Sequence, residues 1–524
     1  MNERFIARRR LLRGAATLGA SGRLAQRFGH ILPKAGAIGA AAAGLLPQAA
    51  RADANPQVSP LDAWVDAFAD LRGTYGPTTV AFDRPLPGHL KGTLYRNGPA
   101  RMRRGATEYQ HWFDGDGMVH AFRIGESSLR HHARMVLTDK YQAEQKAGRF
   151  LRPGFGSRIA DSLPISKPDD INVANINVLP LGDELLALWE AGSPWRIDAD
   201  TLQTLGRKVW TEETDGVAFS AHPKVDVDGT VWSFGYMAGS GKLVLYRLDP
   251  RGGLRATRLI DAPNADMVHD FAITRRYLVF VLMPLVFDRE APRGNNSFLD
   301  MMKWRPERAG TILLVDKDTL EVAHRFETAP TAFFHVGNAW EDGDTVRIHL
   351  MRIDDFEGLM DNLVDAFQGR AMKLPSQTRP VEMVADLRTN RTEVRSLSRE
   401  TAEFPRIDPR HVGRRTGAMF VASRSAAMPD GLFGMNAVAR MDTASGRMQR
   451  FDYGGETLAE EHVFVPRTGA PESSGWLLGT ARNWATRQTT FSVFDAAAID
   501  AGPIAQARLP YGLPLGLHGA FVAA

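Results

Sequence analysis

The chain has 524 residues, of which 44% are hydrophobic and 24% charged, and it contains no cysteine. This length and composition suit several ordinary globular domains or one large β architecture, and the absence of cysteine excludes disulfides and thiolate metal sites. The net charge of +4 comes from the first 52 residues, with nine basic residues and one acid; the remainder carries 55 basic and 59 acidic residues. Such a balance gives no indication of nucleic-acid binding.

The first 52 residues have the pattern of an export signal. Arg8 to Arg13 match the twin-arginine consensus, an Ala/Gly-rich stretch follows at 35–46, and Ala50-Arg51-Ala52 forms a small-x-small cleavage site. Export by this route follows folding, which suits a protein that acquires a metal in the cytoplasm. We expect a signal peptide over 1–52, a single domain over 53–524 and a periplasmic location; a disordered basic tail on a cytoplasmic protein is the alternative.

Alternating apolar and polar residues, the period of half-buried β-strands, dominate the chain after residue 90. Clear examples lie at 230–234, 277–281 and 345–350. Helical periodicity is confined to Leu61–Leu71 and Phe356–Phe367. The pattern predicts an all-β fold with few helices.

An internal repeat divides this β region. An apolar strand end followed by Asp and a polar turn recurs six times, and an Asp carboxylate in that place can accept from amides two residues on. A weaker first copy lies at Phe122–Gly125. Seven units of about four strands each predict a seven-bladed β-propeller, with generic turns in a large β protein as the alternative. The six aspartates are Asp198, Asp249, Asp316, Asp386, Asp442 and Asp495.

Four histidines stand where strands begin or end: His222, His269, His335 and His518. The innermost strands of a propeller line its axis, so one residue from each of four blades can meet there. The first two intervals between them, 47 and 66 residues, each fit a step of one blade, and the last interval, 183 residues, fits a step of about three blades. Neutral imidazoles leave a divalent metal its full charge, which suits binding of a small gas or an electron-rich substrate. The alternative for any one of these histidines is an ordinary surface or core side chain that binds no metal.

Three glutamates occupy apolar or turn contexts that look too dry for a solvated charge: Glu190, Glu403 and Glu461. Histidines that bind a metal usually donate their other N–H to a carboxylate, which fixes the tautomer and the direction of the ring. The three glutamates are candidates for that role, and backbone-bonded or surface acids are the alternative.

The motifs together resemble the carotenoid cleavage oxygenases, the family that includes apocarotenoid and stilbene dioxygenases. The resemblance runs over most of the body of the chain and follows the order of the family's motifs. His462 departs from it, because the family commonly has Pro at this position. The segments that carry the resemblance are Leu94–Pro99, His111–His120, Ala221–Pro223, Val268–Phe271, Phe334–Ala339, Glu403–Arg406, Val463–Arg467 and His518.

The resemblance implies a seven-bladed propeller with one Fe(II) per chain on its axis, held by the four histidines, with the three glutamates as acceptors for three of the imidazoles. It also implies cleavage of an electron-rich carbon–carbon double bond by O2 to give two carbonyl products. We expect a carotenoid or apocarotenoid substrate. Met283–Phe287 and Phe356–Leu374 are candidate apolar mouth segments for contact with a membrane, with buried core as their alternative, and we expect no obligate protein partner.

A phenolic stilbene is the alternative substrate, for which the resemblance implies a Tyr and a Lys that bind the ring hydroxyl. Tyr109 and Lys140 are candidates for this pair, against an ordinary solvated lysine. Two other classes stay open, a calcium-dependent hydrolase and a non-enzymatic binding platform. The first needs axial carboxylates, and the second has no use for axial histidines. An isomerase within the family would also carry the iron site.

Overall fold

The computed structural model describes residues 65–68, 73–291, 296–370 and 377–524. The predicted leader over 1–52 lies outside these residues, so the leader and the periplasmic location stay predictions. Of the helix expected over Leu61–Leu71, the described part contains the short 3-10 helix η1 (Asp66–Phe68). No helix in the described ranges is long and apolar enough to span a bilayer.

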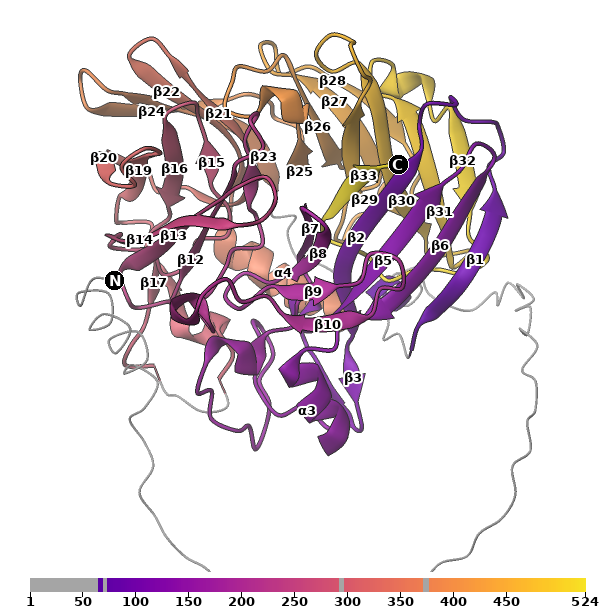
Figure 1. Cartoon of the computed structure of the whole chain (residues 1–524), viewed down its shortest axis with the longest axis horizontal. Coiled ribbons are helices and arrows are strands. Elements are labelled where there is room, and N and C mark those ends of the chain that lie inside the picture. The colour runs from indigo at the N-terminus through magenta and orange to yellow at the C-terminus, as the bar shows by residue number, and fades with distance from the viewer. Residues whose placement is uncertain (1–64, 69–72, 292–295, 371–376) are drawn as a thin grey trace, which may run out of the picture. The chain divides into compact units, whose positions relative to one another are not determined.

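Seven antiparallel sheets, numbered here as blades I to VII, surround a common centre, which confirms the predicted propeller (Figure 1). The strands of each blade are given from the innermost outward. Blade I consists of β33 (Gly519–Ala523), β2 (Gly92–Arg101), β5 (Asp116–Ile124), β6 (Ser128–Met135) and β1 (Tyr75–Ala81), and blade II of β7 (Asn177–Leu181), β8 (Glu184–Leu188), β9 (Trp195–Ile197) and β10 (Thr204–Arg207). Blade III consists of β11 (Lys224–Val225), β12 (Val231–Tyr236), β13 (Lys242–Leu248) and β14 (Leu254–Asp261), and blade IV of β15 (Ala272–Ile273), β16 (Tyr277–Leu282), β19 (Gly310–Asp316) and β20 (Val322–Thr328).

Blades V to VII follow the same plan. Blade V consists of β21 (Ala332–Asp342), β22 (Thr345–Ile353), β23 (Thr378–Asp386) and β24 (Arg391–Ser396). Blade VI consists of β25 (Ala402–Arg406), β26 (Ala418–Ser423), β27 (Ala437–Asp442) and β28 (Met448–Asp452), and blade VII of β29 (Thr457–Pro466), β30 (Gly475–Asn483), β31 (Gln488–Asp495) and β32 (Ala505–Arg508). Two hairpins lie outside the blades: β3 (Arg103–Arg104) with β4 (Thr107–Glu108), and β17 (Leu285–Phe287) with β18 (Met302–Trp304).

The two ends of the propeller meet in blade I. Strand β33, from the end of the chain, pairs with β2, from its beginning, from Gly92 opposite Ala523 to Arg96 opposite Gly519. In Figure 1 the yellow C-terminal strand lies beside the indigo N-terminal one. This pairing closes the ring of blades and places His518, the residue before β33, at the centre.

The aspartate repeat marks one recurrent position, the turn from the third strand to the fourth in blades II to VII. In blade II, for example, Asp198 accepts from the backbone N–H of Asp200 at 3.1 Å and of Thr201 at 2.7 Å. The weaker copy at Phe122–Gly125 lies at the same turn in blade I. The repeat was therefore a correct count of blades, because it follows a turn that every blade must make.

The segments inserted between strands gather on one face of the propeller. Because neighbouring strands are antiparallel, all the aspartate turns lie on one face of the propeller. The connections from the second strand to the third lie on the opposite face, together with the segments that lead into the innermost strands. Helix α4 (Phe356–Phe367), as predicted, and the β17–β18 hairpin are two of these connections. They pack in one apolar cluster with Phe334 and Phe113. A cap thus covers the face where the histidines enter.

A second helix, α3 (Asp139–Ala147), precedes blade II and was not predicted. It has no apolar stripe, because its buried residues are Lys140, Tyr141 and Glu144. Its end signals were readable, however: Thr138 caps the helix by accepting from the N–H of Tyr141, and Gly148 ends it in the left-handed conformation.

Candidate metal centre

The four predicted histidines come together from four different blades. His222 and His269 lie in the segments leading into β11 and β15, His518 directly precedes β33, and His335 lies within β21. Their side-chain ligand atoms all lie within 4.8 Å of one another. Within the described residues this is the one group of three or more His, Cys, Asp or Glu side chains suited to a metal ion.

Irregular pairing accompanies these side chains in three of the innermost strands. The register of β21 shifts between Phe333 and Val336, on either side of His335. Strand β25 shifts between Glu403 and Arg406, directly after Glu403, and strand β29 shifts around Glu461. A β-bulge redirects a side chain that regular alternation would send elsewhere. The bulges therefore belong to the construction of the centre.

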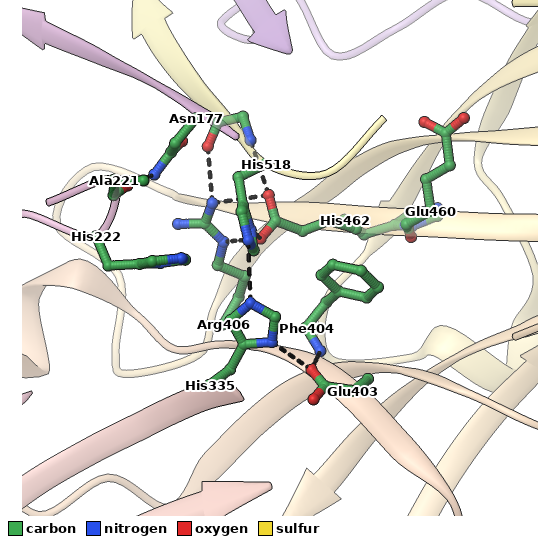
Figure 2. A network of polar contacts seen from close by, with 12 residues as sticks. Asn177, Ala221, His222, His335, Glu403, Phe404, Arg406, Glu460, His462 and His518 are labelled. Atoms are coloured by element: carbon green, nitrogen blue, oxygen red, sulfur yellow. Dashed lines mark hydrogen bonds and ion pairs between the residues drawn. The ribbon is translucent and has the colours of Figure 1, made fainter. Parts of the chain in front are cut away.

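The imidazoles face each other in pairs and are buried. Nε2 of His222 lies 3.0 Å from Nε2 of His269, and Nε2 of His335 lies 3.1 Å from Nε2 of His518. The four residues are between 4 and 8% exposed. In Figure 2, the rings of His335 and His518 point toward each other with His222 beside them.

The three predicted glutamates each accept from one imidazole. His269 donates its Nδ1–H to Glu190 at 2.6 Å, His335 to Glu403 at 2.5 Å and His518 to Glu461 at 2.8 Å. Each donor and acceptor come from different blades, so the bonds also tie the blades together. The structure places all three glutamates where the sequence predicted acceptors.

This hydrogen bonding decides which nitrogens can bind a metal. A neutral imidazole that donates a hydrogen bond from Nδ1–H to a carboxylate presents a lone pair at Nε2. For His335 and His518 the two lone pairs then face each other at 3.1 Å, an arrangement that is repulsive unless a metal ion or a proton lies between them. The donor set consists of imidazole nitrogens, which suit iron and other transition metals and not calcium. The residues present fit an Fe(II) ion.

Burial keeps two of the histidines in the neutral form that a ligand requires. Burial, together with the neighbouring imidazoles, holds the pKa of His222 well below its usual range. Burial likewise lowers the pKa of His518 to about 4, against the opposing charge of Glu461. For His335 the effect of burial is outweighed by the charge and hydrogen bond of Glu403 together with the charges of Asp270 and Glu461, so its pKa is raised.

Two further residues complete the centre and were not singled out from the sequence. Arg406 donates two parallel hydrogen bonds to Glu461, at 2.8 and 2.7 Å. Burial alone would raise the pKa of the Glu461 carboxyl, but Arg406 and His518 together hold it well below its usual range. Phe404 packs its ring 5.3 Å from His335 and 5.5 Å from His518 and adopts a φ of +55°. Both belong to the Glu403–Arg406 motif, so the motif was a signal for their importance but not for their contacts.

The predicted phenol-binding pair, Tyr109 and Lys140, is also brought together. The Lys140 ammonium lies 5.2 Å from the centroid of the Tyr109 ring, and both residues are buried. Lys140 is paired with Asp116 at 2.9 Å and with Glu144 at 2.7 Å, so it is not a solvated surface lysine. Tyr109 packs in a cluster that includes Phe367 at the end of α4.

Comparison with known proteins gives three agreements. The family model described as "Retinal pigment epithelial membrane protein" matches residues 72–523. The chain is 30% identical to the apocarotenoid-15,15'-oxygenase of Synechocystis over 83% of its own length and 91% of that protein, and 29% identical to lignostilbene-alpha,beta-dioxygenase isozyme III of Sphingomonas paucimobilis over 83% and 91%. A crystal structure of the cobalt-substituted Synechocystis oxygenase superposes with a TM-score of 0.79 at 27% identity, covering 89% of this chain and 99% of the other.

Replacing His335 by Ala is expected to abolish metal retention while the protein stays a folded β structure, because one of four converging nitrogens is lost. Metal content by elemental analysis and circular dichroism check this. His349→Ala is the matched control, since His349 is buried in the same blade, on β22, outside the group of four. Full metal content in the His335 variant would refute its assignment as a ligand.

Replacing Glu403 by Gln is expected to weaken metal binding roughly 10–100-fold, because His335 loses its anionic acceptor. Metal affinity measured by competition with a chelator tests this expectation. Glu382→Gln is the control, because Glu382 contacts a buried histidine of blade V, His349 at 3.4 Å, that is not part of the centre. Equal affinities in the two variants would contradict the role of Glu403.

Proposed function

The chain belongs to the carotenoid cleavage oxygenases, and from this premise we propose that it is an Fe(II)-dependent dioxygenase that cleaves a carbon–carbon double bond of a carotenoid or apocarotenoid. The observation that carries the proposal is the convergence of four imidazoles, three of them fixed by glutamates. We propose His222, His269, His335 and His518 as the ligands of one Fe(II) per chain.

The chemistry requires little beyond iron, O2 and the alkene. Bound iron would supply the one-electron and O2 chemistry that amino-acid side chains lack. The carbon–carbon double bond provides the electrons, and both atoms of O2 end in the two carbonyl products, so no external reductant is required. The protein's task is to hold the imidazoles in place, to exclude water and to orient the alkene.

The surroundings of the centre favour an apolar substrate. The ring of Phe334 packs 5.1 Å from that of His269 and belongs to the apolar cluster under the cap. A polyene offers no group for hydrogen bonding, so it needs apolar walls, and methionine and aromatic side chains adapt to such a ligand. Both predicted mouth segments, Met283–Phe287 and the described part of Phe356–Leu374, contribute to this cluster, which includes Met267, Met302, Met360, Phe113 and Phe155.

A phenolic stilbene is the second candidate substrate, favoured by the position of Lys140 over Tyr109. A buried ammonium beside a tyrosine can receive the hydroxyl or phenolate of a substrate ring, and Lys140 has a third N–H beyond its two carboxylate partners. The similarity to the lignostilbene dioxygenase supports the same reading. A calcium-dependent hydrolase is disfavoured, since the centre offers nitrogen ligands in place of oxygen.

Incubation of the iron-loaded protein with β-carotene, an apocarotenal and a hydroxystilbene under isotope-labelled O2 tests the activity. We expect one substrate to be cleaved into two carbonyl products that each carry one labelled oxygen atom, as mass spectrometry would show. Absence of cleavage with all three substrates contradicts the proposed reaction, and label in only one of the two products contradicts the dioxygenase stoichiometry.

Tyr109→Phe separates the two substrate classes. If the pair binds a phenol, loss of the hydroxyl should lower kcat/KM for a hydroxystilbene about 10–100-fold, because a hydrogen bond involving a charged group is lost. The same variant should cleave an apocarotenal at the wild-type rate. An unchanged kcat/KM for the hydroxystilbene would remove Tyr109 from the proposed phenol site.

A further inference from the structure

A buried carboxylate beside the centre joins three blades without touching any of the four imidazoles. Asp270 directly follows His269 and is 2% exposed. Its Oδ1 accepts from Nζ of Lys224 at 2.7 Å, and its Oδ2 accepts from the backbone N–H of Val336 at 2.8 Å. Lys224 begins β11 in blade III, and Val336 lies on β21 in blade V.

Each partner in this bridge is a chain neighbour of a histidine of the centre. Lys224 lies two residues after His222, Asp270 one after His269 and Val336 one after His335. Asp270 therefore links three segments that each adjoin a histidine of the centre. The N–H of Val336 sits within the bulged part of β21, so Asp270 also provides a partner for an amide where the regular ladder is interrupted.

The opposite half of the ring is held in a different way. There Glu461 joins blades VI, VII and I, because it accepts from Arg406 and from the N–H of Gly519, but it also accepts from the imidazole of His518. Replacing Glu461 therefore changes a histidine directly. Asp270 forms no hydrogen bond to an imidazole among the bonds of the described residues, so its effect on the positions of the histidines passes through the strands, while its charge also acts on His335 and that of Lys224 on His222 through space.

We propose that Lys224 and Asp270 are positioning residues, which hold the strands of blades III to V so that His222, His269 and His335 keep the spacing that binds the metal. This inference rests on the proposed metal centre. It assigns the pre-organisation of three ligands to one inter-blade ion pair, and it predicts that metal affinity falls when the pair is removed although all four imidazoles and all three glutamates remain.

The test uses the full-length protein with the double substitution Lys224→Met and Asp270→Asn. Removing both charges avoids leaving one ion buried without its partner. Co(II) is the probe, because its visible absorption reports the arrangement of its ligands. We expect the affinity for Co(II) to fall about 10–100-fold, as for other residues that orient metal ligands, and the absorption spectrum of the bound ion to change.

The chain offers a matched control. Lys317 and Asp226 form a second Lys–Asp pair, 2.6 Å apart, that also joins blades III and IV but bonds to no neighbour of a histidine of the centre. The double substitution Lys317→Met and Asp226→Asn should lower the temperature of thermal unfolding and leave Co(II) affinity and spectrum as in the wild type. A merely structural role of Asp270 predicts the same result for both pairs.

The outcomes separate the two proposals. If the wild type binds one Co(II) and the Lys224/Asp270 variant binds it equally well with the same spectrum, the positioning role is wrong while the metal centre stands. An equal loss of affinity in the Lys317/Asp226 control also overturns the positioning role. If the wild type binds no Co(II), the metal centre and this inference both fail. Should the double variant not fold, Asp270→Asn alone, which keeps the shape of the side chain, decides by the same readings.

Discussion

The constraint on which the structure depends is the mutual repulsion of nitrogen lone pairs at the axis. Glutamates accept hydrogen bonds from the Nδ1–H groups of His269, His335 and His518, so the opposite ring nitrogens face the centre as acceptors. Two of these nitrogens lie 3.1 Å apart, which is stable only with a metal ion or a proton between them. The fold must therefore force together groups that would separate on their own, and a closed ring of blades is suited to this.

The ring is closed around the centre by polar bonds as well as by strand pairing. Asn177 of blade II donates to the carbonyl of Ala221 at 2.8 Å, next to His222 (Figure 2). The Asp270 bridge joins blades III to V, the His335–Glu403 bond joins V to VI, and Arg406 with Glu461 joins VI to VII and I. The N–H of His518 returns to blade II through the carbonyl of Ile176 at 3.1 Å. Each link lies at or beside one of the four histidines, so the stability of the ring and the geometry of the centre have a common origin.

Much of this could be predicted from the sequence, because the turn aspartates and the axial residues repeat with the blades. The blade count came from Asp198 and its equivalents, and the histidines and glutamates stood in motifs that the family resemblance made specific. The bulges in β21, β25 and β29 could not be predicted, because a bulge depends on the partner strand and not on local residue pattern. Helix α3 was missed because its buried face is made of Lys140 and Glu144, charges that a search for apolar periodicity discards. The bond from Asp270 to Lys224 joins residues 46 positions apart, and only the folded arrangement shows it.

The central claim is that four imidazoles, and no carboxylate, bind the iron. X-ray absorption at the iron K edge of the loaded protein tests it most directly, because the outer-shell scattering from imidazole rings differs from that of carboxylates. The account predicts scattering from four imidazole ligands in the wild type, matching the four converging histidines, and from three in any iron that a His335→Ala protein still binds. A wild-type spectrum that requires a glutamate ligand, or fewer than four imidazoles, would contradict it.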